Sequence, residues 1–256
     1  MKIAISGKGG VGKTTVASTM VRLLSDLGYR VLAIDADPAM NLPGQIGIKL
    51  EGTEFKPLSE MKDFIEARTG AKRGEYGGFF KLNPKVDDIP EIYSLKKDHI
   101  KVLVLGSINK GGGGCFCPEN VLLRNLLAHV LIERDEWVVV DMDAGLEHLG
   151  RGTASHVDRL IVVVEPGIQS IKTAKKIKDL AKDIGLDNVA IVANKVTGRE
   201  DIEFIENNLP YMKLLGSVSF SERIKEAERQ GISPYDMDEN LKTEVRKIVD
   251  ALSQKL

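Results

Sequence analysis

The sequence feature that most constrains the fold is a glycine-rich run close to the N-terminus. Residues Gly7–Thr14 read GKGGVGKT, which matches the pattern Gly-x-x-x-x-Gly-Lys-Ser/Thr. The run lies between a predicted strand, Ile3–Ser6, and a predicted helix, Lys13–Leu27. Glycines let the backbone curl tightly, so that successive N–H groups point at phosphate oxygens beside the positive end of the helix dipole. The pattern and its context therefore predict a nucleotide-binding loop rather than a plain glycine-rich turn.

Short apolar runs alternate with longer amphipathic segments along the whole chain. This alternation is typical of repeated βαβ units, in which helices cover both faces of a mostly parallel sheet. The predicted strands are Ile3–Ser6, Val31–Ile34, Val102–Leu105, Val138–Asp141, Leu160–Val164, Val189–Ala193 and Leu214–Val218. The predicted helices are Lys13–Leu27, Glu119–Glu133, Ile168–Ile184, Asp201–Asn207, Ser221–Gln230 and Leu241–Gln254. We expect an α/β P-loop NTPase fold with a mostly parallel central sheet of about seven strands flanked by helices.

Length and composition limit the remaining possibilities. We expect the 256 residues to form a single P-loop ATPase domain, with an irregular excursion over 51–100 that contains a short helix at Ser59–Ala67. The net charge of −1 argues against a nucleic-acid partner. No apolar run approaches the ~20 residues of a membrane span, and the N-terminal residues lead directly into a strand without a signal peptide. Two cysteines are no disulfide framework, so we expect a cytoplasmic protein.

Each residue of the glycine-rich loop has an expected role in binding ATP and Mg²⁺. Lys13 is expected to reach the β- and γ-phosphates, Thr14 to ligate Mg²⁺, and Thr15 to donate to the α-phosphate. The residues expected to surround the phosphates are Gly9, Gly10, Val11 and Gly12.

Acidic residues follow two predicted strands at their carboxyl ends, where ligands of open α/β sheets bind. Asp35 or Asp37 is expected to orient a water molecule or to hold Mg²⁺ through water, unless both only cap a turn. Asp141 ends an apolar strand in the Walker B manner and can hold Mg²⁺-bound water opposite the loop threonine. Asp143 and Gly145 then occupy the position of a switch that senses the γ-phosphate.

The stretch Asn194–Thr197 reads NKVT and resembles the Asn-Lys-x-Asp base reader of GTPases. Thr197 lacks the carboxylate that would accept the two N–H donors of guanine. We therefore favour ATP, with Asn194 pairing with the adenine edge and Lys195 beside it. The alternative is a strand exit in which Asn194 satisfies backbone groups only.

The two cysteines lie close together in the run Gly111–Asn120, which reads GGGGCFCPEN. A structural thiolate site normally closes with four ligands, and Cys115 and Cys117 supply only two. A two-fold homodimer supplies four, and would form a Cys₄ site for Zn²⁺ or Ni²⁺ on its axis. The alternatives are an intrachain disulfide and two unreactive thiols.

A second lysine, Lys8, precedes Lys13 in the loop. The run KGGVGKTT resembles the deviant Walker A class, which includes the nitrogenase iron protein, MinD, ParA-type partition ATPases and nickel-insertion ATPases. The resemblance implies a homodimer in which Lys8 contacts the nucleotide of the facing subunit, as an arginine finger does. It also assigns the water-positioning role to Asp37. The alternative for Lys8 is a solvated surface lysine. The expected catalytic residues are Lys8, Lys13, Asp37 and Asp141.

Three separated motifs narrow the resemblance to one family. The runs Gly111–Asn120, Asp141–Ala154 (DMDAGLEHLGRGTA) and Leu82–Pro90 (LNPKVDDIP) are together similar to the CooC family, accessory ATPases in the maturation of nickel carbon monoxide dehydrogenase. The resemblance implies a nucleotide-dependent metallochaperone that delivers nickel to the dehydrogenase or to an associated acetyl-CoA synthase. Two other classes remain open: an iron–sulfur reductase of the nitrogenase iron protein type, and a MinD- or ParA-like ATPase that positions itself on a membrane or nucleoid.

Two further features each have two interpretations. His148 follows the Walker B segment and is either a transient metal ligand or a capping or surface residue. An apolar stripe marks the last predicted helix, at Leu241, Val245, Ile248, Leu252 and Leu256. The stripe either lies on a membrane surface or, as we favour, docks on the sheet of its own domain.

Overall fold

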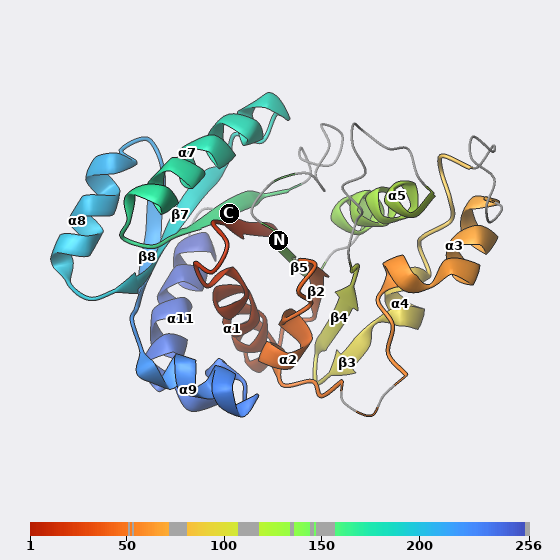
Figure 1. Cartoon of the computed structure of the whole chain (residues 1–256), viewed down its shortest axis with the longest axis horizontal. Coiled ribbons are helices and arrows are strands. Elements are labelled where there is room, and N and C mark those ends of the chain that lie inside the picture. The colour runs from red at the N-terminus through yellow and green to blue at the C-terminus, as the bar shows by residue number, and fades with distance from the viewer. Residues whose placement is uncertain are drawn as a thin grey trace.

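In the part of the chain that the computed structural model describes, eight strands form one sheet with helices on both of its faces (Figure 1). The structure describes residues 1–50, 52, 54–71, 81–106, 118–133, 136–143, 146 and 157–253. The strands are β1 (Lys2–Gly7), β2 (Val31–Ala36), β3 (Leu95–Lys97), β4 (Ile100–Val104), β5 (Trp137–Met142), β6 (Arg159–Val164), β7 (Val189–Val196) and β8 (Lys213–Ser219). The helices are α1 (Lys13–Asp26), α2 (Leu42–Ile46), the 3₁₀ turn η1 (Leu58–Glu60), α3 (Lys62–Thr69), α4 (Ile89–Tyr93), α5 (Pro118–Glu133), α7 (Ile168–Asp183), α8 (Arg199–Asn208), α9 (Glu222–Gln230), α10 (Pro234–Met237) and α11 (Glu239–Ser253).

The sheet has the order β3-β4-β2-β5-β1-β6-β7-β8, and every neighbouring pair is parallel except β3 and β4. The predicted α/β fold with a mostly parallel sheet is therefore confirmed. The strand absent from the prediction is β3, an edge strand of three residues that pairs antiparallel with β4. Two of its residues are lysines, so its sequence contains no apolar run from which a strand could be predicted.

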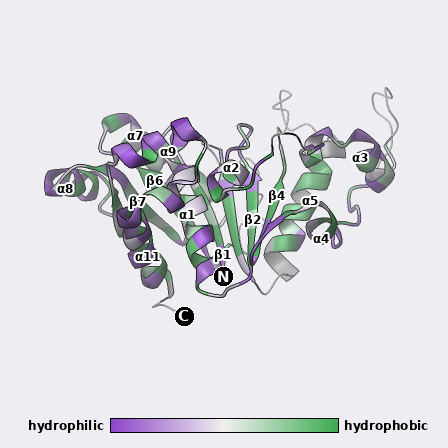
Figure 2. Cartoon of the chain, turned by 90° about the horizontal axis from the view of Figure 1, so that it is seen from below, coloured by the Kyte–Doolittle hydropathy of each residue, from purple (hydrophilic) through white to green (hydrophobic). Residues whose placement is uncertain are grey.

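Two apolar cores lie on opposite faces of the sheet because successive strand residues point to opposite sides. Ala4, Val138 and Val140 face the core built with α3, α4, α5, α7 and α8. Ile3 and Ile5 face the core built with α1, α2, α10 and α11. Figure 2 shows the strands in green between helices whose outer surfaces are purple, as expected for a sheet covered on both sides.

The apolar stripe of the C-terminal helix docks on the sheet. Its described members are all buried in the core beneath α1 and α11: Leu241, Val245, Ile248 and Leu252. The side chain of Ile248 also meets Gly216 of β8 so closely that a Cβ atom there would stand 2.8 Å from it. The favoured interpretation of this stripe is therefore confirmed for these residues, while Leu256 lies outside the described part.

The described part of 51–100 packs against the edge of the sheet that carries β3 and β4. Its helix α3 overlaps the predicted helix at Ser59–Ala67, and the chain enters that helix through η1. Leu58, Ile65 and Ile89 from this region are buried in the core with α5. The described residues of the excursion therefore contribute regular elements and core side chains.

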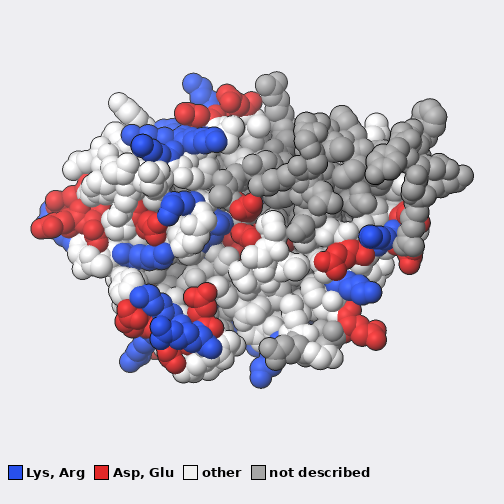
Figure 3. Space-filling view, viewed as in Figure 1, with Lys and Arg blue, Asp and Glu red and all other residues white. Residues whose placement is uncertain are grey.

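The surface mixes both signs of charge. On the face seen in Figure 3, basic and acidic side chains occur together over α8 and α9. Among the helices that the structure describes, none combines enough length with enough apolar character to cross a bilayer.

Candidate nucleotide-binding site

The residues predicted to bind nucleotide gather at one edge of the sheet, where the central strands end. The loop after β1 lies between the ends of β5 and β6, because Ile5 is in register with Asp141 and Gly7 with Val163. Asp35 at the end of β2 is in turn in register with Asp141. Segments distant in sequence thus meet at the carboxyl edge, the place where open parallel sheets bind ligands.

The glycine-rich loop is fixed by close contacts with β6 and β7. At Gly7, a Cβ atom would stand 2.5 Å from the carbonyl oxygen of Val163, so only glycine fits there. Gly12 adopts φ +93° just before α1, and a Cβ atom on it would collide with the side-chain amide of Asn194. The same amide donates a 2.7 Å hydrogen bond to the carbonyl of Val11. These contacts hold the loop at the N-terminus of α1.

Asn194 therefore binds a backbone carbonyl, as in the alternative interpretation of this residue as part of a strand exit. Its side chain is buried, with one N–H committed to the loop carbonyl. Lys195 follows with φ +57°, and its Nζ donates to the carbonyl of Gly10 at 2.7 Å. Both residues lie against the loop, as expected for residues of the nucleotide site, and the adenine contact stays a prediction.

Asp35 and Asp37, the two acids predicted to serve either the phosphate site or a turn, have different contacts in the structure. Buried Asp35 accepts backbone hydrogen bonds from Asp37 (3.1 Å) and Leu42 (3.0 Å), so it caps the turn after β2. Asp37 accepts one bond from the backbone N–H of Ala39, at 2.9 Å. Its other oxygen lies 3.9 Å from the Nζ of Lys13, which is itself only 6% exposed. Asp37, but not Asp35, therefore faces the expected phosphate position.

Asp141 is fully buried, and neither of its oxygens has a hydrogen-bond partner among the described residues. Burial raises its pKa to about 7; the side chains of Thr14 and Lys13 oppose this rise, and the nearby carboxylate of Asp35 adds to it. A buried carboxylate without partners beside a loop threonine suits a hard cation that takes oxygen ligands. The residues present therefore fit the expected Mg²⁺ ion.

Lys8 lies on the side of the loop that faces β6, where it is bound by a carboxylate. Its Nζ donates to Oε1 of Glu165 at 3.0 Å, and Lys195 donates to Oε2 of the same carboxylate at 3.1 Å. Although burial opposes it, these two hydrogen bonds lower the pKa of Glu165. Lys8 is therefore a partly exposed lysine that is ion-paired within its own chain, and its contact with the nucleotide of a facing subunit stays a prediction.

Glu165 is a site residue that the sequence prediction missed. It directly follows the apolar strand β6, as Asp37 directly follows β2. The signal that predicted Asp35 and Asp37, an acid at the carboxyl end of an apolar run, could also have found it. A second missed contact comes from Ser6, whose hydroxyl donates to the carbonyl of Asp143 at 3.1 Å and joins β1 to the chain after β5.

Several predicted residues lie outside the described part of the chain: Cys115, Cys117, Gly145 and His148. Within the ranges that the structure describes, no three His, Cys, Asp or Glu side chains group together in a way that could hold a metal. The predicted Cys₄ site therefore stays a prediction. The backbone carbonyl of Thr15, in the first turn of α1, accepts a hydrogen bond from the hydroxyl of Ser18 at 3.2 Å. The contact of the Thr15 hydroxyl with an α-phosphate stays a prediction.

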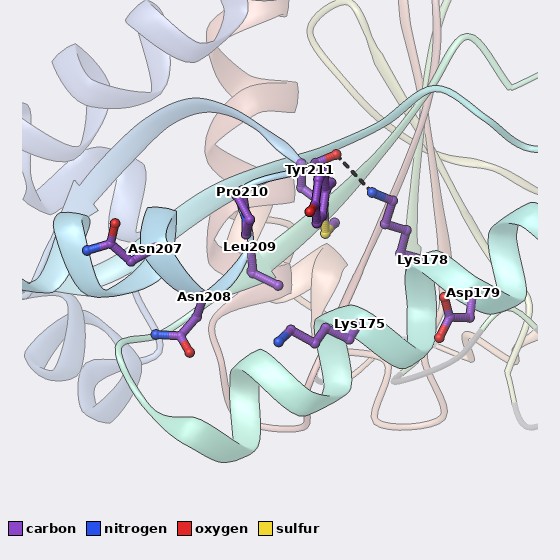
Figure 4. Close-up of a pocket in the computed structure, with 9 residues that line it drawn as sticks. Lys175, Lys178, Asp179, Asn207, Asn208, Leu209, Pro210 and Tyr211 are labelled. Carbon is purple, nitrogen blue, oxygen red and sulfur yellow. Dashed lines mark hydrogen bonds between the residues drawn. The ribbon is translucent and has the colours of Figure 1, made fainter.

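A separate cavity of about 510 Å³ opens between α7 and the segment that joins α8 to β8 (Figure 4). Lys178 spans it by donating to the carbonyl of Tyr211 at 2.8 Å. Because this segment precedes β8, it lies toward the amino ends of the strands, opposite the glycine-rich loop. None of the residues predicted for the nucleotide site lines it.

Comparisons with known proteins agree with this geometry. The family model CbiA, the CobQ/CobB/MinD/ParA nucleotide binding domain, matches residues 2–235. The carbon monoxide dehydrogenase accessory protein CooC of Rhodospirillum rubrum is 44% identical over 257 residues, which cover 100% of this chain and 97% of that protein. An uncharacterised ATP-binding protein of Methanocaldococcus jannaschii is 45% identical over 251 residues, or 97% of this chain and 96% of that protein.

Solved structures are similar in fold. The MinC:MinD cell division protein complex of Aquifex aeolicus contains a chain that matches with a TM-score of 0.69 and 20% identity, covering 99% of this chain and 96% of that one. A ParA family ATPase from Chlorobium tepidum gives a TM-score of 0.69 at 18% identity, covering 98% and 97%. At these identities the likeness supports the fold alone.

Proposed function

Because this chain belongs to the CobQ/CobB/MinD/ParA nucleotide-binding family, and within it to the CooC-type ATPases, we propose that it is a nickel-delivering accessory ATPase of carbon monoxide dehydrogenase. The observation that carries this proposal is the 44% identity to an accessory protein of that enzyme over the full chain. We further propose that the protein dimerises around ATP in the cytoplasm.

ATP hydrolysis uses the residues at the carboxyl edge of the sheet. The loop amides and Lys13 hold the β- and γ-phosphates, and Asp37, 3.9 Å from Lys13, orients the attacking water. Thr14 and Asp141 would hold Mg²⁺, whose chemical contribution is to neutralise charge on the phosphate oxygens. Lys8 supplies further positive charge to the nucleotide of the partner subunit.

Nickel is the cargo, and the cysteines are its proposed ligands. Cys115 and Cys117 of each subunit together supply four thiolates, which no single chain contains. If nucleotide and metal both bind the closed dimer better than the open one, each raises the affinity for the other. Hydrolysis removes the γ-phosphate contacts, loosens the dimer and releases nickel to the dehydrogenase or to an associated acetyl-CoA synthase.

Sedimentation velocity combined with metal analysis tests this proposal. The protein is incubated with ATP or ADP, with and without Ni²⁺ or Zn²⁺. We expect a dimer with about one metal ion per pair of subunits when ATP and metal are both present. A protein that stays monomeric under those conditions contradicts the proposal, and visible absorption after anaerobic purification would instead favour an iron–sulfur carrier.

Two variants separate the halves of the function. Cys115→Ser should lose the metal and the ability to activate the dehydrogenase, yet still hydrolyse ATP. Lys13→Ala should lose hydrolysis while keeping both cysteines. A Cys115→Ser protein that matures the dehydrogenase normally would rule out the thiolate site.

A further inference from the structure

Glu165 binds two lysines that both belong to the nucleotide site. Its oxygens accept from Lys8 at 3.0 Å and from Lys195 at 3.1 Å. Its own backbone N–H donates to the buried hydroxyl of Ser170 in α7, at 3.1 Å. The carboxylate is thereby fixed between β6, α7 and the glycine-rich loop.

The two lysines differ in what else they hold. Nζ of Lys195 also donates to the carbonyl of Gly10, so Lys195 is bound to the loop as well as to Glu165. Its backbone stands at φ +57°, a conformation that L-residues rarely adopt and that surrounding contacts must maintain. Lys8 is bound by Glu165 from within its own chain. Lys195 is therefore held by two contacts, whereas Lys8 can leave Glu165 without disturbing the loop.

We propose that Glu165 is a positioning residue that holds Lys8 within its own subunit until the nucleotide of a partner subunit draws that lysine across the interface. This inference rests on the proposed function, because it assumes that Lys8 acts in the facing subunit. An amine bound to Glu165 has to leave that carboxylate before it can reach a phosphate of another chain.

Because Glu165 binds two lysines, the release of Lys8 from it costs little free energy. When Lys8 leaves, Lys195 still neutralises Glu165 and still holds Gly10, so neither a bare carboxylate nor a loosened loop results. The pair is also partly exposed, at 39% for Lys8 and 24% for Glu165, and an ion pair that water reaches is weak enough to exchange. Glu165 therefore sets how much ATP is needed before two subunits close.

The test compares the wild type with Glu165→Gln by sedimentation velocity over a range of ATP concentrations. Loss of two such pairs per dimer should lower the ATP concentration at half-dimerisation about fivefold. Dimerisation in ADP, which has no γ-phosphate, should not change. The ATPase rate should rise at low protein concentration, where the wild type is mainly monomeric.

Glu203→Gln is the matched control. Glu203 pairs with Arg199 on exposed α8, so this variant makes the same change of charge away from the loop and should behave as the wild type does. Should Glu165→Gln fold poorly, Glu165→Asp keeps the charge but is too short to bridge both lysines, and should shift dimerisation in the same direction by less.

The outcomes separate two failures. A wild type that does not dimerise with ATP contradicts the proposed function itself. A wild type that dimerises with ATP, beside a Glu165→Gln protein that has the same ATP midpoint or shifts equally in ATP and ADP, overturns only the role of Glu165.

Discussion

Two buried aspartates, Asp141 at the nucleotide site and Asp238 ahead of α11, have opposite electrostatic environments. Both are at most 5% exposed. Asp238 accepts hydrogen bonds from the hydroxyl of Ser221 and from the backbone N–H groups of Asn240 and Leu241, at 3.0 and 3.1 Å for the latter two. Although burial opposes it, these bonds lower the pKa of Asp238. Burial of Asp141 without partners instead raises its pKa to about 7.

The difference separates groups that stabilise the chain from groups that serve a ligand. On folding, Asp238 exchanges its hydrogen bonds with water for hydrogen bonds with the protein. Asp141 also loses its water, and only the nearby side chains of Thr14 and Lys13 offset part of that loss. Such an uncompensated carboxylate destabilises the fold, and it is retained where a cation or phosphate chemistry requires it. Each prediction below tests one side of this contrast.

The largest expected effect is that of Asp141→Asn on hydrolysis. Removal of the charge that we propose holds Mg²⁺ should reduce the ATPase rate about 100-fold or more. The same change should stabilise the free protein at pH 8, by about 1–3 kcal/mol, because it removes a charge that burial disfavours. Urea unfolding in the absence of nucleotide measures the gain.

The pH dependence of that gain identifies its cause. Between pH ~4 and ~7 the folded wild type keeps a proton on Asp141 that the unfolded chain has released, so wild-type stability falls as pH rises through this window. The advantage of Asp141→Asn should therefore be absent near pH 4, grow up to about pH 7 and stay constant above. An advantage that is equal at pH 4 and pH 8 would show that the charge is not responsible.

The opposite result is expected for Asp238→Ala. This change leaves two N–H groups at the start of α11 and the hydroxyl of Ser221 without their acceptor, and should destabilise the protein by about 2 kcal/mol at pH 8. The loss should shrink only as pH falls below about 4, where the unfolded chain takes up a proton that the folded carboxylate, with its lowered pKa, still resists. The ATPase rate below the unfolding temperature should not change. A stabilised Asp238→Ala protein would remove the contrast with Asp141.

Local patterns predicted most of the fold because they depend on neighbours in sequence. The run before Gly7 and the run before Asp141 are apolar on both faces, so their strands and their places beneath helices follow from composition alone. The edge strand β3 depends instead on pairing with β4, and its short, lysine-rich sequence carries no such pattern. Helix α2 contains Pro43 and Gly44, which argue locally against a helix.

At the nucleotide site, the sequence predicted which residues lie near one another but not which of them form hydrogen bonds or ion pairs. A glycine-rich loop and an acid after an apolar strand are local signals. The bonds from Lys8 to Glu165 and from Asn194 to Val11 join residues 157 and 183 positions apart, and only the folded sheet brings them together. The division of labour between Asp35 and Asp37 likewise depends on where the turn after β2 places its N–H groups.

The smallest expected effect concerns Asn194, which combines a structural bond with a predicted ligand contact. Loss of its bond to Val11 in Asn194→Ala should loosen the loop and weaken ATP binding about fivefold, which corresponds to the net value of about one buried hydrogen bond. If the bond to the loop accounts for the effect, binding of GTP should weaken by the same factor, which titration calorimetry can measure.

Asn188→Ala provides the control on the same strand segment. Asn188 precedes β7 and also donates its side-chain amide to a backbone carbonyl, that of Asp158, but at the amino edge of the sheet. Nucleotide affinity should not change in this variant. A loss in Asn194→Ala that is several times larger for ATP than for GTP would instead show that the side chain reads adenine. Asn194 would then belong with Asp141, among the groups placed for a ligand, rather than with Asp238.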